Sequence, residues 1–146
     1  ERLLPFRIES FSLRPDSGGA GKFRGGLGFE KKYRILEDCL LQTNLDRTDH
    51  PAWGVLGGKD ALAGSVVVVN EQTGKTASMC KARGEGLKAG EIVILSTGGG
   101  GGYGPVEERD LAALQRDLDE GYITLAAAEK IYNVVVNEDG RVTRPA

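Results

Sequence analysis

The apolar residues of this chain fall mostly into short runs that alternate with polar residues or are rich in β-branched side chains. Both patterns are typical of short strands. The run at 65–70 (Ser-Val-Val-Val-Val-Asn) is apolar on both faces, which predicts a central strand. The expected strands lie at residues 3–13, 29–36, 39–45, 65–70, 75–81, 91–96 and 133–137.

Turn-forming residues indicate how these strands connect. Two hairpins are expected, one between 29–36 and 39–45 and one between 65–70 and 75–81. Residues 84–90 predict a surface turn. About seven or eight short strands at fairly regular spacing indicate a β-rich barrel or sandwich.

The C-terminal part of the chain changes to the helix period. Four apolar side chains recur at helical spacing: Val106, Leu111, Leu114 and Leu118. Thr124 is a suitable N-cap for a second helix at 125–132. We therefore predict an α+β fold, predominantly β, with a barrel- or sandwich-like module of glycine-rich loops at 1–104. Two helices and a short last strand follow at 105–146 and pack on the same domain.

The stretch at 97–105 (Thr-Gly-Gly-Gly-Gly-Gly-Tyr-Gly-Pro) lies between a predicted strand and a predicted helix with Pro105 at its first position. Glycine loses more conformational entropy on folding than any other residue, so a run of five requires a reason. One reason is packing of the backbone too close for side chains, within the protein or against a partner chain. The other is contact with an anion or substrate, because a helix N-terminus offers free N–H groups and a favourable dipole.

Two nucleotide-binding motifs are matched only in part. The dinucleotide fingerprint G-x-G-x-x-G occurs within the glycine run, but too little chain follows for the further βα units of such a domain. Gly74-Lys75-Thr76 supplies the end of a phosphate-binding loop, but Val69 stands where its first glycine belongs. A free-standing nucleotide-binding domain is therefore a third, less favoured interpretation.

Composition narrows the class of protein. The 146 residues make up one domain, and 22 glycines favour a loop-rich fold. The net charge of −2, without basic clusters among aromatic residues, argues against nucleic-acid binding, and no apolar run approaches the length of a membrane span. Cys39 and Cys80 are too far apart for a redox or zinc motif, so we expect two reduced, half-buried thiols in a cytoplasmic protein.

A second glycine-dense segment, at 14–28, carries charged residues among its glycines. Cations beside a permissive backbone can hold a carboxylate or phosphate. In the alternative interpretation the loop is structural and its arginines pair with nearby acids. The candidate substrate-binding residues are Arg14, Asp16, Ser17, Lys22 and Arg24 here, and Gly99, Gly100, Gly101 and Tyr103 in the later stretch.

The segment at 46–53 holds the only histidine and the only tryptophan of the chain. Its candidate catalytic residues are Asp46, Arg47 and His50, because a histidine beside carboxylates can act as an acid or base. The alternative is a turn in which His50 makes an ordinary loop hydrogen bond. The sequence shows no metal-ligand cluster.

Taken together, these stretches resemble the C-terminal part of the hydantoinase B/oxoprolinase family. The resemblance covers nearly the whole chain. It rests on residues 13–28 (Leu-Arg-Pro-Asp-Ser-Gly-Gly-Ala-Gly-Lys-Phe-Arg-Gly-Gly-Leu-Gly), 46–54 with 57–58, 99–104 with 108–110, and 117–136. One position departs from the family pattern, which has Asp-Pro directly after Gly-Tyr-Gly, whereas this chain has Pro105-Val106. A helix-capping carboxylate is therefore lost, and we expect an anion or another group in its place.

The resemblance implies a role in ATP-dependent opening of cyclic amides such as hydantoins or 5-oxoproline. In such enzymes a partner A subunit binds ATP with Mg²⁺ and activates the substrate, and the B subunit completes the hydrolysis. Related two-component enzymes carboxylate ketones such as acetone and acetophenone, so the parent reaction stays open. B subunits are several times longer than this chain, and the resemblance places their metal ligands in an N-terminal part without a counterpart here.

We therefore interpret the chain as the C-terminal segment, or a separately encoded small subunit, of such a hetero-oligomer, inactive alone. In one hypothesis it packs against the rest of the B component and shapes a cavity for a small-molecule substrate. Arg14, Lys22 and Arg24 would then anchor an acyl-phosphate or carboxylate intermediate. In the other hypothesis it is a structural interaction module without catalytic residues, and its glycine loops are contact surfaces.

Overall fold

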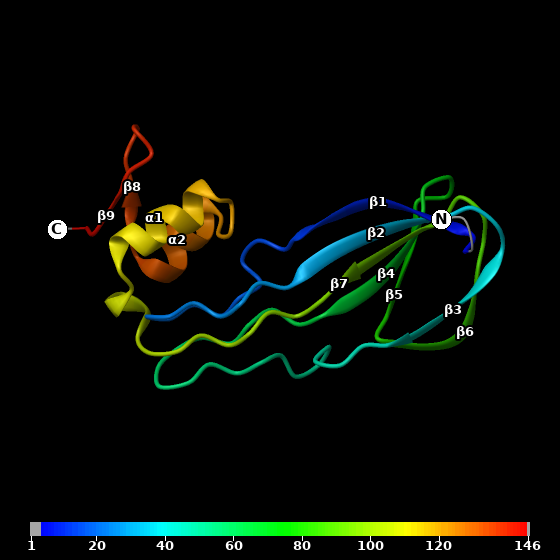
Figure 1. Cartoon of the computed structure of the whole chain (residues 1–146), viewed down its shortest axis with the longest axis horizontal. Coiled ribbons are helices and arrows are strands. Elements are labelled where there is room, and N and C mark those ends of the chain that lie inside the picture. Colours follow the sequence, from blue (N-terminus) through cyan, green and yellow to red (C-terminus); the bar gives the residue numbers. More distant parts are fainter. Residues whose placement is uncertain (1–3, 146) are drawn as a thin grey trace.

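A computed structural model describes residues 4–145 of the chain. The molecule is elongated, with a sheet region at one end, a pair of helices at the other and extended chain segments between them (Figure 1). The main sheet has five antiparallel strands in the order β1-β2-β7-β4-β5. These strands are β1 (Phe6–Leu13), β2 (Phe29–Ile35), β7 (Ile92–Ser96), β4 (Ser65–Asn70) and β5 (Lys75–Met79).

A two-stranded ribbon, β3 (Cys39–Asn44) with β6 (Lys81–Leu87), covers part of one face of this sheet. The alternation of strand side chains places Val66 and Val68 of β4 and Val93 of β7 toward the ribbon. The core between the two layers consists of Ile35, Val66, Val68, Leu87 and Val93. The prediction of a predominantly β, sandwich-like module is confirmed, and the described strands do not close into a barrel.

The expected hairpin between 29–36 and 39–45 is wrong, because β3 pairs with β6. Both edges of β2 are already occupied by β1 and β7, so β3 has to cross to the second layer. Asp38 holds this crossing in place. Its carboxylate accepts hydrogen bonds from Lys88 Nζ at 2.6 Å and from the Ala89 N–H at 3.0 Å. These bonds connect the start of β3 to the end of β6.

The other expected hairpin, between 65–70 and 75–81, is confirmed by the pairing of β4 with β5. β4 also pairs with β7, so it is an interior strand as predicted. The turn expected at 84–90 is wrong in its first half, because β6 continues to Leu87. The side chain of Leu87 is buried in the core, and this burial holds the last part of the strand against the sheet.

The C-terminal segment forms the two predicted helices, α1 (Leu111–Asp119) and α2 (Leu125–Tyr132). Thr124 caps α2 as predicted, since its side chain accepts a hydrogen bond from the Ala127 N–H. Pro105 is not the first residue of a long helix. It precedes a single 3-10 turn, η1 (Val106–Glu108), and α1 begins only after Asp110, whose carboxylate caps it. A small hairpin of β8 (Val135–Val136) and β9 (Val142–Thr143) ends the fold, and β9 was not expected.

The helices pack on the glycine-rich segments through a second hydrophobic core. Leu114 and Ala128 are fully buried at its centre, and Ala20 reaches it from the first glycine-rich segment. Neither α1 nor α2, nor any other helix within residues 4–145, is long and apolar enough to cross a membrane. Cys39 and Cys80 are free and half-buried, as expected.

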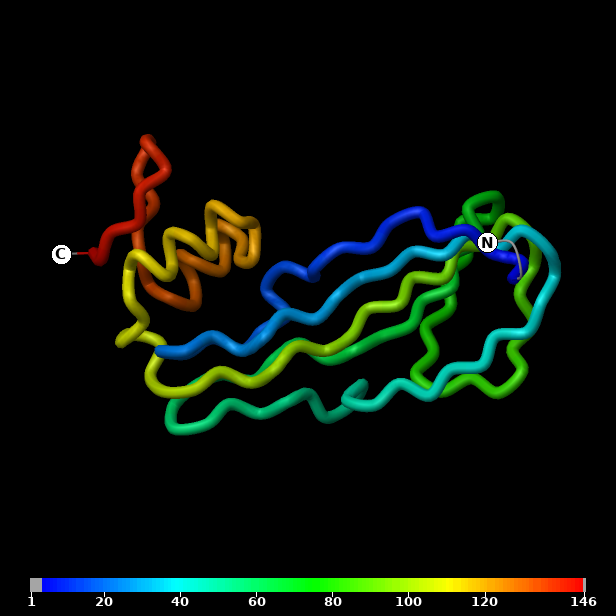
Figure 2. The backbone as a smooth tube through the Cα atoms, in the orientation of Figure 1, coloured from blue at the N-terminus to red at the C-terminus, as the bar shows by residue number. Residues whose placement is uncertain are grey.

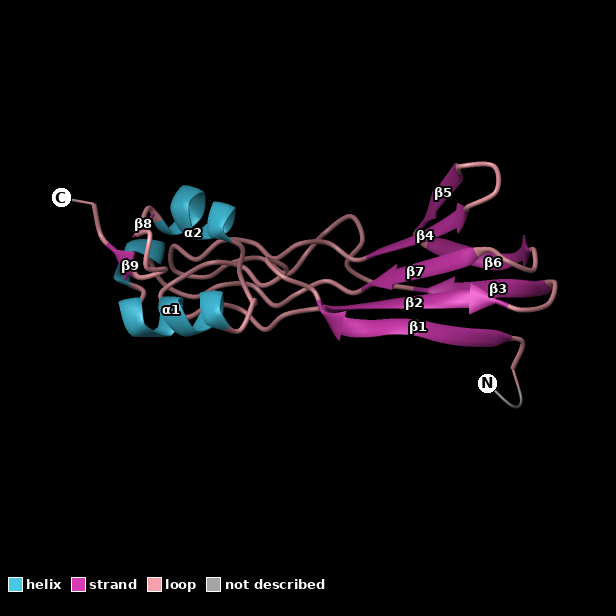
Figure 3. Ribbon diagram, turned by 90° about the horizontal axis from the view of Figure 1, so that it is seen from above, coloured by secondary structure: helices cyan, strands magenta, loops and turns pink. Residues whose placement is uncertain are grey.

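Three glycine-rich segments, at 17–28, 52–64 and 97–105, run side by side between the sheet and the helices (Figures 2 and 3). We call them the glycine bundle. The segment at 97–105 lies inside it and exchanges backbone hydrogen bonds with the other two. The Gly100 N–H donates to Gly26 O, the Gly102 N–H to Lys59 O and the Gly104 N–H to Val55 O, each at 2.9 Å. Extended segments without internal hydrogen bonds satisfy their backbone groups in this way.

The glycines of the central segment are needed because neighbouring backbones approach too closely for a Cβ atom. A Cβ on Gly101 would lie 1.9 Å from Trp53 O, and one on Gly102 would lie 2.0 Å from Ala20 O. None of the glycines 98–102 has a left-handed φ, so unusual dihedral angles are not the reason for the glycine run. Of the two reasons given for the glycine run, the structure supports close backbone packing within the protein.

We predict that Gly101→Ala lowers the free energy of unfolding by about 3 kcal/mol or more, because a backbone carbonyl has to move to admit the methyl group. Gly26→Ala is the matched control, since it lies in the same bundle and its Cβ would meet no atom within 4 Å. The control should change stability by no more than about 1 kcal/mol. Urea unfolding of both variants measures the difference, and equal losses would contradict the close-packing explanation.

Candidate functional site

Two of the predicted substrate-binding residues, Arg14 and Ser17, fasten the first glycine-rich segment to the end of the sheet. The Arg14 guanidinium donates hydrogen bonds to Ala63 O at 2.7 Å and to Thr97 O at 3.3 Å. Ser17 is fully buried, donates to Arg14 O and accepts from the Gly28 N–H at 2.8 Å. Both side chains therefore satisfy backbone groups where three segments meet.

Asp16 and Lys22 connect the same segment to the helical part. The Asp16 carboxylate accepts hydrogen bonds from the N–H and the hydroxyl of Thr124, each at 2.8 Å, at the start of α2. The Lys22 ammonium forms an exposed ion pair with Glu108 at 2.9 Å. These contacts favour the interpretation in which the charges of the loop pair within the protein.

Arg24 takes part in a buried cluster of two arginines around one carboxylate. Its Nε and Nη2 each lie 3.1 Å from an oxygen of Asp117, and Arg109 bonds the same carboxylate. The two guanidinium groups stack over Tyr122 and Tyr132, at 5.5 and 5.8 Å from the ring centroids. Asp117 is only 6% exposed. The cluster therefore joins the glycine bundle to α1, and no sequence pattern indicated Asp117 as the partner of Arg24.

The central glycine segment offers few free donors to an anion. The N–H groups of Gly99 and Gly100 donate to Leu62 O and Gly26 O, and Tyr103 exchanges two backbone hydrogen bonds with Phe23. The position where an anion was expected is Pro105, which precedes η1 and provides no side-chain cap, whereas Asp110 caps the separate helix α1. An anion beside Pro105 stays a prediction. A role of Gly99, Gly100, Gly101 and Tyr103 in substrate binding stays a prediction, and their backbone contacts support a structural role.

The candidate catalytic residues Asp46, Arg47 and His50 lie together on a loop beyond β3. They line a hollow of about 160 Å³ with Lys81. The carbonyl of Arg47 accepts a hydrogen bond from the Gly64 N–H, and Arg47 has a left-handed φ of 58°. Within residues 4–145 no three His, Cys, Asp or Glu side chains are close enough to hold a metal ion. The catalytic role of these residues stays a prediction.

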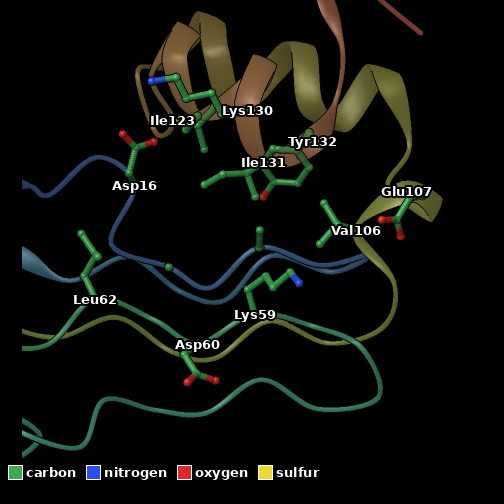
Figure 4. A pocket seen from close by; sticks show the side chains of 13 residues that line it. Asp16, Lys59, Asp60, Leu62, Val106, Glu107, Ile123, Lys130, Ile131 and Tyr132 are labelled. Atoms are coloured by element: carbon green, nitrogen blue, oxygen red, sulfur yellow. The ribbon is translucent and has the colours of Figure 1, made fainter. Parts of the chain in front are cut away.

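A larger cavity, of about 510 Å³, lies between the glycine bundle and α2 (Figure 4). This volume is within the range of small-molecule sites. Its wall combines apolar side chains with a few charged ones. Asp16 is the one candidate site residue from the sequence among these charged side chains. The residues that line it are Asp16, Gly18, Ala20, Lys59, Asp60, Leu62, Val106, Glu107, Ile123, Ala127, Lys130, Ile131 and Tyr132.

Tyr132 is the buried polar side chain of this cavity. It is only 2% exposed, and Figure 4 shows its hydroxyl directed toward the space between α2 and the bundle. Burial raises the pKa of Tyr132 above its ordinary value of 10.0, and the positive charge of Arg109 partly opposes this shift. The hydroxyl therefore stays protonated near neutral pH and can donate a hydrogen bond.

Lys59 supplies a further donor from the bundle, whereas the ammonium of Lys130 on α2 is directed away from the space between α2 and the bundle (Figure 4). The ion pairs of lysines in the part of the chain that the structure describes involve Lys22, Lys32 and Lys88, so the Lys59 ammonium is available. The cavity can therefore hold an apolar group and donate hydrogen bonds to a carbonyl or carboxylate. The sequence spacing of Lys59, Lys130 and Tyr132 does not indicate that they line one cavity. Ala128 and Tyr132, four residues apart, do indicate which face of α2 is buried.

Comparison with known proteins gives matches over most of the chain. A model of the hydantoinase B/oxoprolinase family matches residues 1–106. An uncharacterized protein of Methanocaldococcus jannaschii is 38% identical over 136 residues, which cover 93% of this chain and 24% of that protein. The caprolactamase subunit beta of Pseudomonas jessenii is 30% identical over 150 residues, which cover 100% of this chain and 26% of that subunit.

Two solved structures have the same arrangement of elements. The crystal structure of the ATP-dependent caprolactamase from Pseudomonas jessenii matches with a TM-score of 0.81 and 27% identity, over 94% of this chain and 24% of that chain. A nucleotide-free acetone carboxylase matches with a TM-score of 0.72 and 20% identity, over 95% of this chain and 23% of that chain, which is a likeness of fold. The chain therefore spans about a quarter of the length of the relatives it matches.

We predict that Asp117→Asn lowers the free energy of unfolding by about 3–5 kcal/mol, because the buried Arg109 and the largely buried Arg24 lose the carboxylate that pairs with both. Glu108→Gln is the control, since it breaks the exposed ion pair with Lys22. It should cost less than about 1 kcal/mol. Thermal or urea unfolding distinguishes the two, and similar losses would show that the Asp117 cluster is not a stabilising link.

The raised pKa of Tyr132 predicts a loss of stability in alkali. The folded protein holds the phenolic proton of Tyr132 more tightly than the unfolded chain does. The contribution of Tyr132 to the free energy of unfolding is therefore constant below pH 10 and falls as the pH rises through the folded pKa. Tyr132→Phe should remove this part of the slope above pH 10. If the free energy of unfolding falls equally with pH in the wild-type protein and in the variant above pH 10, Tyr132 does not cause this part of the slope.

Proposed function

This chain belongs to the hydantoinase B/oxoprolinase family, and we propose that it forms the C-terminal segment or a separately encoded small subunit of an ATP-dependent enzyme that hydrolyses cyclic amides. The observation that carries the proposal is the match to a caprolactamase subunit beta along the full length of this chain. The fold agrees, since the TM-score to the solved caprolactamase is 0.81. The acetone carboxylase shares the fold alone at 20% identity, so ketone carboxylation is the second candidate.

Within such an enzyme this chain acts chiefly as a scaffold. Arg14, Asp16, Lys22 and Arg24 are engaged in contacts inside the protein, and the central glycines pack against backbone. The cavity beside Tyr132 is the part of the chain suited to touch a substrate, because it combines an apolar wall with available donors. The proposal therefore gives this chain a wall of the substrate space and places bond cleavage elsewhere in the enzyme.

ATP and its Mg²⁺ fit this chain poorly, so we assign them to an A-type partner subunit. Most of the backbone donors that would cradle phosphates are already used in the bundle, and Gly74-Lys75-Thr76 lies at the tip of the β4–β5 hairpin. Metal ions fit poorly as well, because the described residues bring together no suitable set of ligands. We assign any catalytic metal to the portion of a B component that this chain does not span.

Reconstitution tests the proposal. The chain is combined with an A-type subunit and the remaining B-type polypeptide from the same source, and ATP-dependent ring opening is measured with a lactam, a hydantoin and 5-oxoproline. We expect no turnover by the chain alone, turnover by the full set and loss of turnover when the chain is left out. Turnover by the isolated chain, or full activity without it, would overturn the proposal. ATP-dependent consumption of acetone and bicarbonate, in place of ring opening, would establish the second candidate.

A further inference from the structure

Large apolar side chains project from the outer surface of the glycine bundle. Trp53 is 77% exposed, Leu56 68% and Phe23 61%, although each belongs to a residue type that is usually buried. Val55 and Tyr103 are about half exposed beside them. We call these five residues the aromatic ridge.

Tyr103 connects the members of the ridge. It forms backbone bridges to Phe23 on one side and to Val55 on the other. The rings of Phe23 and Tyr103 are 6.2 Å apart between centroids, and Leu56 follows Val55 directly in the chain. Phe23, Val55 and Tyr103 are therefore brought together by direct contacts, and Trp53 and Leu56 are exposed in the same segment as Val55.

The ridge cannot be buried by a rearrangement of the bundle itself. Its interior is filled by backbone, because a Cβ on Gly101 would lie 1.9 Å from Trp53 O and one on Gly58 would lie 2.2 Å from Gly102 O. In the sheet region, by contrast, Val66 and Val93 are buried against a second layer. Small side chains of the bundle such as Ser17 and Ala20 are buried, whereas the large ridge side chains lie on its outer surface, where contact with another polypeptide would remove them from water.

We propose that the aromatic ridge is the surface on which the remainder of a B-type subunit packs. This assignment rests on the proposed function. Relatives that match along the chain are about four times as long, since the chain covers 24% and 26% of them, so a large polypeptide lies outside the structure. Clustered Trp, Tyr and Phe side chains are the composition typical of the energetic centre of a protein–protein interface. The occupant is therefore an apolar surface of that remaining polypeptide.

A paired substitution tests the assignment. Trp53→Ser with Leu56→Ser removes the two most exposed ridge side chains. Leu40→Ser is the matched control, because Leu40 is 75% exposed on β3, outside the bundle. Each variant is titrated with the remaining B-type polypeptide from the same source, and the dissociation constant is measured. Circular dichroism of the free chains checks that the variants fold. We expect binding at least about 30-fold weaker for the ridge variant and less than about 3-fold weaker for the control.

Hydroxyl-radical labelling of the unmodified chain gives a second measurement that needs no variant. Oxidation of Phe23, Trp53 and Tyr103 should fall several-fold in the complex relative to the free chain, while oxidation of Leu40 stays the same. Wild-type affinity of the ridge variant, or unchanged labelling of the ridge in a formed complex, overturns the assignment and leaves the proposed function intact. If the wild-type chain does not bind the remaining polypeptide at all, the proposed function fails as well. Self-association of the wild-type chain that the ridge variant abolishes identifies a second copy as the occupant and also overturns the assignment.

Discussion

The structure depends on the close approach of backbone to backbone in the glycine bundle. The segment at 97–105 is surrounded by the segments at 17–28 and 52–64, and its peptide groups bond directly to theirs. Because a Cβ on Gly101 or Gly102 would fall within 2.0 Å of a carbonyl oxygen, the bundle exists only where side chains are absent. It connects a sheet with its own core to a helical end with a second core, and fixes the position of each relative to the other.

Charged side chains complete this connection. Arg24 crosses from the bundle to Asp117 on α1, Asp16 bonds Thr124 at the start of α2, and Arg14 bonds carbonyls near the end of the sheet. The two arginines have the chemistry of an anion site when the sequence is considered alone. In the folded chain their partners are already present, so they stabilise the arrangement of segments around the cavity beside Tyr132.

The chain therefore presents two surfaces with different properties. The cavity between the bundle and α2 has an apolar wall with the Tyr132 hydroxyl and the Lys59 ammonium group. The aromatic ridge is apolar and exposed, and the closely packed backbone beneath it leaves no room for its side chains. A wall for a substrate and a contact for a larger polypeptide are both consistent with a chain that spans a quarter of its relatives.

The sequence by itself determined most of the elements. Local patterns are sufficient for the β4–β5 hairpin, for the Thr124 cap and for the predominance of short strands, because these depend on neighbouring residues. The run of glycines also showed that a close contact or an anion had to be present. It did not show which, because the choice depends on residues such as Trp53 and Ala20 that lie far away in the chain.

Only the tertiary structure decided the pairing of β3 with β6 and the partners of the charged residues. The crossing of β3 follows from the occupation of both edges of β2, and the pairing of Arg24 with Asp117 spans 93 residues. The cavity also depends on distant segments, since Lys59 and Tyr132 come from opposite walls. Periodicity describes what one segment buries, and it contains no information on which other segment it is buried against.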